Sequence, residues 1–556
     1  MPLAGRPSSV DGRGPSWLSL SVAPKSPLPV GEVARSALLR RLPSTLLRLR
    51  LLDLVRLCRP RWATLVLFGA VVAVTLFRYR VLAGAGAPST IDAGNWLNFA
   101  DSLLGDNRGF SLAGYPPVVP AVTGALVTLL GAVRGVALMG ALCSAAPSLG
   151  VYRALGMAGL KNERLIPAVL ILGTSSIGEA AAWGGFPQLL GIGLMPIAAM
   201  VAIETFDAPS RVKGVKLGLV VMASLATTHF VSVVIVVVIG LILVSAVFRN
   251  WSPMWRRDIM TIAPVILLPS IWLVPVYLKL SHALILNPNE FSAFNDLTWR
   301  SGIVRLNGLN RGATALWRVL VPLAVASAMV WPLRRKPVWR LSTSLLLATL
   351  ALLLVTREAR FLYLVPLVVA TGVATWLKYL TTLRPWLVEG RQVDAVRVGL
   401  SMLTAAVLVA QLLSGLSIFQ RQRDFYGVLT PGIVTAIVAA DADTAGNQII
   451  AIPSLDDAPI GWWVEGLTDA QVVYGSPLRW LNFADEVKRA QVANNIFDPA
   501  FPDEATLAEL EAASVNVVIL PRRWTWFDDD LVEQWIDRND LAVLERNIDA
   551  LAIEIG

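Results

Sequence analysis

Cysteine and histidine are scarce in this chain of 556 residues, which contains two of each. Cys58 precedes the first long apolar run and Cys143 lies inside a later one, so we expect no disulfide bond between them. The histidines and acidic residues show no metal-ligand spacing, so the sequence assigns no metal site. A divalent cation stays open as a cofactor, because it would stabilise a phosphate leaving group.

Charged residues are also few, at 16% against 55% hydrophobic residues, and the mean hydropathy is +0.61. This composition is typical of a polytopic α-helical membrane protein. The first 30 residues are rich in Pro, Ser and Gly and lack an apolar region followed by a cleavage site. They therefore predict a disordered cytoplasmic tail instead of a signal peptide.

The two charge signs are unevenly distributed. Up to Ser417 there are 39 basic and 16 acidic residues, a net of +23, whereas from Ile418 onwards there are 9 basic and 23 acidic residues, a net of −14. The basic residues lie mostly in short loops between apolar runs, as the positive-inside rule expects of a cytoplasmic face. We therefore expect contact with membrane lipids, no binding to nucleic acid, and a cytoplasmic N-terminus.

The apolar runs predict about eleven transmembrane helices. The run Leu217–Phe248 is too long for one span and is divided at Thr227-Thr228-His229. The other expected spans are Trp62–Phe77, Gly135–Leu155, Leu165–Ala181, Gln188–Ile203, Ile259–Leu278, Ala313–Leu333, Val338–Val355, Phe361–Leu377 and Ala395–Leu413. An odd number of spans places the C-terminal region outside, in a protein of the cytoplasmic (inner) membrane.

The chain divides into three expected parts. Residues 1–60 comprise the tail and a Leu- and Arg-rich helix, which either lies at the headgroups or extends the first span into the cytosol. Residues 61–417 form the transmembrane domain, with long outer loops at 83–117 and 279–312. Residues 418–556 form an extracytoplasmic α/β domain.

Outer loop 83–117 is longer than a simple connection needs. Its apolar residues recur at helical spacing, which predicts a short amphipathic helix on the membrane surface; they are Trp96, Leu97, Phe99, Leu103 and Leu104. Val118–Leu130 is too short to cross the bilayer comfortably and predicts a juxtamembrane helix.

In the C-terminal domain, short β-like runs alternate with helical stretches. The expected strands are Gln448–Ile452, Val515–Leu520 and Leu551–Ile555, and the expected helices are Asp485–Asn495, Asp503–Ala513 and Asp529–Arg538.

Ionisable residues gather at the outer ends of different expected spans. They are Asp92, Glu179, His229, His282, Arg357, Glu358 and Arg360. Taken singly, such residues are usually solvated or hydrogen-bonded at a helix end. Their common level in the membrane favours one shared outward-facing cavity.

Four segments in this order resemble the GT-C superfamily of membrane glycosyltransferases, which use polyprenyl-phosphate sugars. The first two are Ile91-Asp92-Ala93-Gly94 and Tyr115-Pro116-Pro117. The other two are Arg134 at the start of the second span and Arg360-Phe361-Leu362-Tyr363 before Pro366. The likeness covers roughly residues 60 to 415. It implies transfer of a glycosyl residue, with inversion, to a glycan, lipid or protein acceptor of the cell envelope.

The resemblance implies that Asp92 is the catalytic base, although Ala93 and Gly94 stand where such enzymes usually have a second acid. A carboxylate that takes the acceptor's proton fits this chemistry, with Glu179 as the second candidate. Arg360 and Arg357 are expected to bind the donor phosphate, because a guanidinium offers a bidentate fork. His229, His282 and Glu358 are expected to contact substrate or a metal.

The segment Gly461-Trp462-Trp463-Val464-Glu465 combines two indoles with an acid. Stacked indoles and an acid often hold sugar rings, whereas Trp pairs also occur in cores and at membrane interfaces. Trp462, Trp463 and Glu465 are therefore candidates for substrate contact, with a core role as the alternative.

Two other functions fit a basic polytopic protein. A secondary transporter or lipid flippase usually has repeated halves and polar sites near the midplane, and no internal repeat is found here. A receptor or scaffold does not need eleven spans.

Overall fold

The structure is a computed structural model that describes most of the chain. It covers residues 42–84, 86–87, 90–104, 115–283, 314–356, 359–387, 392–442, 448–455, 460–478, 481, 483–498, 501–522 and 527–555. Residues 1–61 and 62–556 form two separate units. The expected cytoplasmic tail lies outside the described residues. In the first unit, the backbone from Leu42 is the start of helix α2 (Leu42–Ala83).

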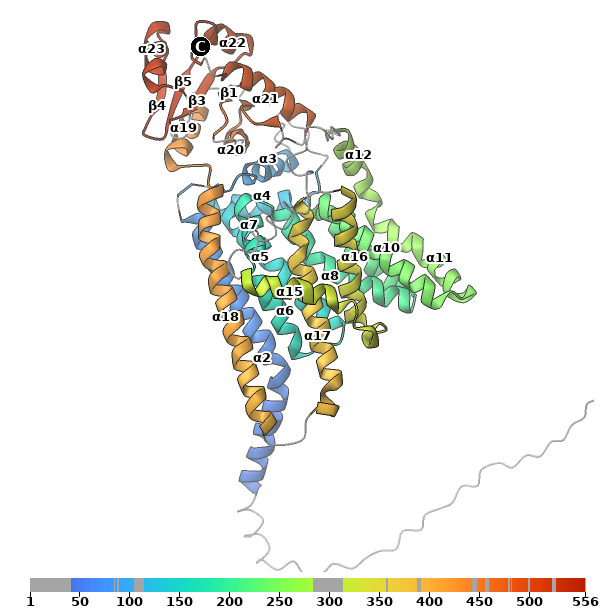
Figure 1. The fold of residues 1–556 in the computed structure, drawn as a ribbon. Helices are drawn as coiled ribbons and strands as arrows, with labels where there is room; N and C mark the ends of the chain where they lie inside the picture. Colours follow the sequence, from blue (N-terminus) through green and yellow to red (C-terminus); the bar gives the residue numbers. More distant parts are fainter. Residues whose placement is uncertain are drawn as a thin grey trace, which may run out of the picture. The chain divides into compact units, whose positions relative to one another are not determined.

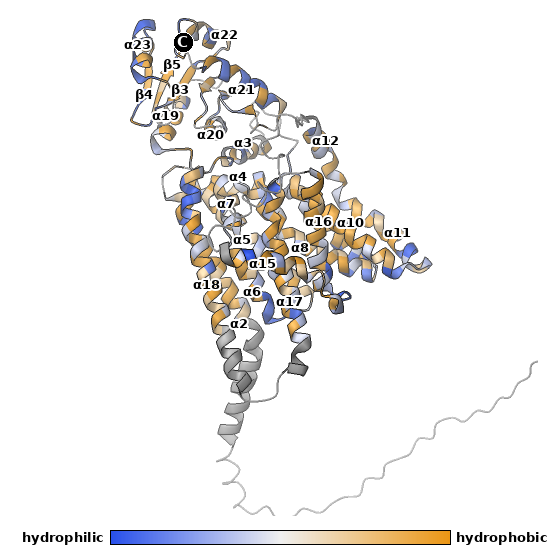
Figure 2. Ribbon diagram, viewed as in Figure 1, coloured by the Kyte–Doolittle hydropathy of each residue, from blue (hydrophilic) through white to orange (hydrophobic). Residues whose placement is uncertain are grey.

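Eight apolar helices in the described residues are long enough to cross a membrane, as the sequence predicts for a multi-pass membrane protein. Figure 2 shows that apolar residues predominate along these helices. Their bounds are Trp62–Ala83 of α2, Ala132–Met157 (α5), Phe186–Asp207 (α8), Phe230–Asn250 (α10), Pro253–Ser281, Pro337–Thr356 (α16), Arg360–Thr382 and Met402–Tyr426.

Three of these spans combine or extend shorter elements. Pro253–Ser281 runs through α11 (Pro253–Leu267), the 3-10 turn η2 (Leu268–Leu273) and α12 (Val274–Ala283). Arg360–Thr382 joins η5 (Ala359–Leu364) to α17 (Val365–Leu387), and Met402–Tyr426 is part of α18 (Gln392–Tyr426).

The expected third span is broken. Its residues form α6 (Leu165–Leu172) and α7 (Ser175–Trp183), which are bent by 50° relative to each other. Side chains from other spans satisfy carbonyl groups at the break: Arg78 Nη2 donates to Leu172 O at 3.1 Å and Gln411 Nε2 donates to Gly173 O at 3.0 Å. The break coincides with Gly173-Thr174-Ser175-Ser176, a turn-type segment inside the apolar run.

The expected eighth span is also shorter than predicted. Its helix, α15 (Thr314–Ser327), ends before the 3-10 turn η4 (Trp331–Leu333), and the apolar part Leu316–Ser327 is below membrane-spanning length. The division at Thr227-Thr228-His229 is confirmed, since α9 (Arg211–Thr227) ends there and α10 begins at Phe230.

Close approach between helices depends on small residues. A Cβ atom on Gly150 of α5 would lie 1.9 Å from the carbonyl oxygen of Gly193 on α8. Because lipid tails are as apolar as the helices, such tight backbone packing is a main source of association between spans.

The first outer loop contains α3 (Ala93–Leu104), and α4 (Val118–Leu130) follows it with the predicted bounds. Most of the apolar face of α3 is covered by protein, however, although Leu103 is 44% exposed. Trp96, Leu97 and Phe99 are buried, and the helix packs against α4 and against α20 (Gly461–Leu467) of the C-terminal domain. The predicted membrane-surface helix is therefore covered by protein.

The C-terminal region is the expected α/β domain, with a five-stranded sheet in the order β2-β1-β3-β5-β4 (Figure 1). Three predicted strands appear as β1 (Ile449–Ile452), β3 (Val517–Pro521) and β5 (Ala550–Glu554). Strands β2 (Gln471–Tyr474) and β4 (Val543–Arg546) are too short and too mixed in sequence to predict. Strands β1, β2 and β3 are parallel, whereas β5 is antiparallel to both β3 and β4.

Three helices of this domain match the predicted ones: α21 (Ala484–Ile496), α22 (Thr506–Ala512) and α23 (Asp529–Asn539). Helix α19 (Pro431–Ala442) precedes the sheet. The last span, α18, continues to Tyr426, which lies past the boundary predicted at residue 418.

Candidate active site

Asp92 lies in the loop directly before α3 and is fixed against the turn between α7 and α8. Its N–H donates to the carbonyl of Trp183 at 2.9 Å. Gly184, the next residue of that turn, has a φ of +101°, and a Cβ there would come within 2.9 Å of the Cβ of Asp92. Trp96 Nε1 donates to Gly184 O at 2.7 Å. The glycine thus allows the first outer loop to sit directly on the α7–α8 turn.

The pKa of the Asp92 carboxyl group departs from its ordinary value. Burial raises its pKa to about 7, while the positive charge of Arg360 opposes this rise. Burial and the charge of Asp92 also raise the pKa of the neighbouring Tyr115 hydroxyl. A general base works best when its pKa lies near the working pH, so Asp92 has the property that its predicted role requires.

Arg360 begins the last turn before α17, where the sequence places it. Its guanidinium lies over the ring of Phe230 at 5.9 Å, and Phe230 stacks on Phe361 with ring centroids 4.7 Å apart. These aromatic contacts hold the arginine at the end of its helix, within electrostatic range of Asp92.

Glu179 lies on α7, the C-terminal half of the broken span. Its Oε1 accepts a hydrogen bond from the Tyr426 hydroxyl at 2.8 Å. Trp183, on the same helix, packs edge-on against Tyr363 at 6.4 Å between ring centroids. Helix α7 therefore carries Glu179 and also provides the carbonyl that fixes Asp92.

His229 lies between α9 and α10, and its ring packs edge-on against Tyr115 at 5.6 Å. Its Nδ1 atom is buried and has no hydrogen-bond partner among the described residues. Tyr115 is thus a neighbour of both Asp92 and His229.

Trp462, Trp463 and Glu465 are placed differently from the substrate-contact prediction. Both indoles are buried, with 4% and 0% of their surface exposed, and Glu465 is 7% exposed. Trp463 Nε1 donates to Thr90 O at 2.7 Å, and Trp462 Nε1 lies 3.1 Å from Glu486 Oε1. With no indole face open to a sugar, the core alternative is correct for this segment.

The remaining predicted residues are not placed. Arg357 and Glu358 lie outside the described residues, and His282 belongs to α12 without a described side chain. Within the described ranges, no three His, Cys, Asp or Glu side chains converge as metal ligands would.

The sequence prediction missed three tyrosines that the structure places at the site. Tyr115 lies beside Asp92 and His229, Tyr426 donates to Glu179, and Tyr363 packs on Trp183. Tyr115 and Tyr363 belong to two of the four segments that carry the GT-C resemblance, so those segments held a usable signal. Tyr426 ends a long apolar helix and has no comparable signal.

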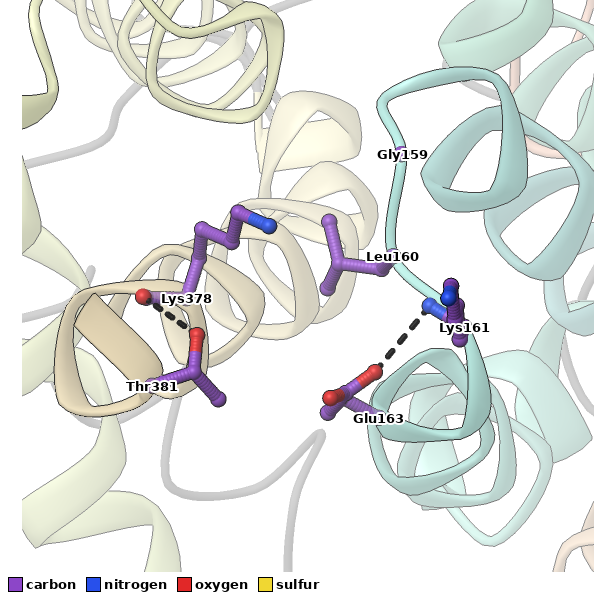
Figure 3. A pocket seen from close by; sticks show the side chains of 6 residues that line it. All are labelled: Gly159, Leu160, Lys161, Glu163, Lys378 and Thr381. Atoms are coloured by element: carbon purple, nitrogen blue, oxygen red, sulfur yellow. Dashed lines mark hydrogen bonds between the residues drawn. The ribbon is translucent and has the colours of Figure 1, made fainter. Parts of the chain in front are cut away.

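A surface pocket lies far from these residues. It is lined by Gly159, Leu160, Lys161, Glu163, Lys378 and Thr381 (Figure 3). Glu163 accepts from the Lys161 N–H at 3.0 Å, and the Thr381 hydroxyl donates to Lys378 O at 2.7 Å. At 1.5 Å per residue, the helix that connects Arg360 to Lys378 separates them by roughly 27 Å. The pocket is therefore distinct from the Asp92 site.

No family model and no curated protein matches this chain. Among solved structures, it is similar to ArnT from Cupriavidus metallidurans bound to undecaprenyl phosphate. The TM-score is 0.53 at 14% identity, over 87% of this chain and 97% of that one. The apo state of the same protein gives 0.52 at 13% identity, over the same shares.

An archaeal oligosaccharyltransferase, AglB from Archaeoglobus fulgidus, has a TM-score of 0.49, which is too low to support an assignment of the fold. The match to ArnT covers both the membrane helices and the C-terminal domain at low identity, and so identifies a fold. This chain therefore has the GT-C fold, as its resemblance in sequence predicts.

Proposed function

We propose that this protein is a glycosyltransferase that moves a sugar from a polyprenyl-phosphate donor to a hydroxyl acceptor at the outer face of the inner membrane. The observation that carries the proposal is that Asp92, a carboxyl group whose pKa is raised to about 7 by burial, lies within electrostatic range of Arg360 and is fixed by the Trp183 carbonyl. The ArnT structure adds support, because a lipid phosphate is bound to a protein of the same fold.

In the proposed reaction, the acceptor oxygen attacks the anomeric carbon of the donor. The acceptor O–H bond breaks and its proton passes to the Asp92 carboxylate. A new C–O bond forms as the bond between the anomeric carbon and the phosphate oxygen breaks, and the polyprenyl phosphate leaves with the electron pair. A single displacement of this kind inverts the anomeric centre.

Arg360 would stabilise the phosphate that leaves. The leaving group is already a good one, so it needs its charge neutralised more than it needs a proton, and a guanidinium does this through charge-assisted hydrogen bonds. Glu179 and the unpartnered Nδ1 of His229 are proposed to orient the sugar or the acceptor. The acceptor is a glycan, lipid or protein of the cell envelope.

In this proposal the N-terminus lies in the cytoplasm and the C-terminal domain lies outside. The excess of basic residues before Ser417 and the acidic balance after it support this orientation. Asp92 and the C-terminal domain then face the same compartment, which agrees with the hydrogen bond between Trp463 and Thr90.

The test is an assay of the purified protein with a panel of radiolabelled polyprenyl-phosphate sugars and extracted envelope acceptors. We expect labelled product and released polyprenyl phosphate with at least one donor, and inversion at the anomeric carbon by NMR. Export of an intact lipid-linked sugar in proteoliposomes, without any transfer, would instead establish the flippase alternative.

A further inference from the structure

The C-terminal domain is bonded to the loop that carries Asp92. Trp463 of α20 is fully buried, and its Nε1 donates to the carbonyl of Thr90 at 2.7 Å. The Thr90 hydroxyl accepts from the N–H of Ala93 at 3.1 Å, which closes a turn around Asp92. The candidate base is therefore held by the C-terminal domain on one side and by the Trp183 carbonyl on the other.

The two segments also meet at backbone distance. A Cβ on Gly94 would lie 2.3 Å from the carbonyl oxygen of Trp462, and a Cβ on Gly466 would lie 2.7 Å from the carbonyl oxygen of Gly94. Glycine at both positions permits this approach, which a side chain on either residue would block. These two contacts therefore fix the position of α20 relative to the start of α3.

A buried polar bridge fixes the same register one turn later. Asn98 Nδ2 donates to Glu465 Oε2 at 3.2 Å, and Arg489 of α21 pairs with the other oxygen, Oε1. Burial raises the pKa of Glu465, and Arg489 opposes that rise. Because a buried ion pair adds little stability over apolar packing, its clearest contribution here is a fixed alignment.

We propose that the C-terminal domain acts as a clamp on the first outer loop, and that Trp463 and Glu465 are positioning residues that hold Asp92 in its reactive geometry. This inference rests on the proposed function for its catalytic consequence. An interface that only stabilises the fold would contain the same contacts, so the test must measure the state of Asp92 itself.

The test compares Trp463→Phe with Trp535→Phe in the full-length protein. The first substitution keeps a buried aromatic ring at the position and removes the N–H that binds Thr90. Trp535 is buried in the same domain, packs on Phe501 at 6.0 Å and lies in a separate core cluster, so its substitution is the matched control. Asn98→Ala is a milder second variant that deletes only the bond to Glu465.

We expect Trp463→Phe to lower kcat about tenfold or more with the donor KM unchanged, since small displacements of a reacting group are costly. In a plot of kcat against pH, the rise on the acid side should move from about pH 7 to a lower pH, because water that reaches the loop reduces the effect of burial on the pKa of Asp92. The charged and titratable groups that act on Asp92, namely Arg360, Tyr115 and Tyr426, are unchanged in all variants. Asn98→Ala should lower kcat and the pH of its acid-side rise by smaller amounts, and Trp535→Phe should match wild type in both.

Hydrogen exchange measured by mass spectrometry gives a readout that needs no activity. We expect amides from Asp92 to Ala100 to exchange at least tenfold faster in Trp463→Phe than in wild type or Trp535→Phe. Unchanged exchange, or faster exchange with kcat and its pH profile intact, overturns the clamp. Absence of transfer by the wild-type protein with every donor overturns the proposed function instead, and leaves the exchange result to decide whether the loop is clamped.

Discussion

Asp92 and Asp207 lie near opposite ends of helix α8, and their charges are balanced in different ways. Asp207 forms ion pairs with Arg249 at 2.8 Å and with Arg340 at 2.5 Å, so its carboxylate joins α8 to α10 and α16. Asp92 has no ion pair among the described residues, and burial raises its pKa to about 7 despite Arg360.

The difference separates a structural acid from a candidate catalytic one. The Asp207 carboxylate makes two direct arginine contacts, and its role is to join three helices. A buried carboxylate that senses an arginine without pairing to it can accept a proton near neutral pH. Substitution of Asp92 should therefore affect turnover, whereas substitution of Asp207 should affect stability.

The largest effect is expected for Asp92→Asn, which keeps the shape of the side chain and removes the proton acceptor. Turnover should fall by about 10² or more. The thermal midpoint should not fall, because no ion pair is lost. Unchanged turnover in an assay of the purified variant would transfer the role of base to Glu179, for which Glu179→Gln is the companion variant.

The pH dependence should sharpen the comparison. Asp92 must be ionised to act as a base, and its pKa is raised to about 7 by burial. Turnover should therefore rise about tenfold per pH unit below 7 and level off above it. A profile already flat between pH 5 and pH 7 would show that no group with this pKa limits the reaction.

Much of the transmembrane layout could be predicted from hydropathy and charge alone. The division at Thr227-Thr228-His229 followed from length, because the run Leu217–Phe248 is too long to cross the roughly 30 Å of one hydrocarbon core as a single helix. The prediction of one continuous span missed the break between α6 and α7, although Gly173-Thr174-Ser175-Ser176 is a local helix stop and start signal. The residues that stabilise the break, Arg78 and Gln411, come from distant helices, so this part of the arrangement has no local signal.

The candidate site was predictable where a charge lies at the end of an apolar run. Asp92, Glu179 and Arg360 were found in this way, because charge in or near hydrocarbon is costly and so informative. Trp462 and Trp463 were ambiguous for the opposite reason: indoles suit both sugar contacts and cores, and only the fold shows that the Trp463 N–H is bonded to the Thr90 carbonyl. The burial that sets the pKa of Asp92 depends on long-range packing and has no local pattern.

A smaller effect is expected for Arg360→Lys, which keeps the charge and loses the planar fork. The loss of one charged hydrogen bond to the donor phosphate is worth about 1.5 to 3 kcal/mol, so the donor KM should rise about tenfold or more with the acceptor KM little changed. Arg249→Lys is the matched control, because Arg249 belongs to the cluster of Asp207, Arg249 and Arg340, and it should leave both KM values unchanged. If the donor KM is the same in both variants, the phosphate is bound elsewhere.

The smallest effect is expected for Asp207→Asn, and it should appear in stability instead of turnover. The substitution removes both ion pairs and leaves Arg340, which is 3% exposed, without its carboxylate partner. Breaking a buried pair is expensive, but the Asp207 side chain is 36% exposed and solvent screens its charge, so the expected loss of stability is about 1 kcal/mol.

Asp424→Asn is the control. Asp424 pairs with Arg423, but its carboxylate is 60% exposed, so losing this pair should change stability little. A lower thermal midpoint for Asp207→Asn than for Asp424→Asn, with wild-type turnover per folded molecule, would establish that the cluster of Asp207, Arg249 and Arg340 is structural. A loss of turnover comparable to that of Asp92→Asn would show instead that the two ends of α8 are coupled.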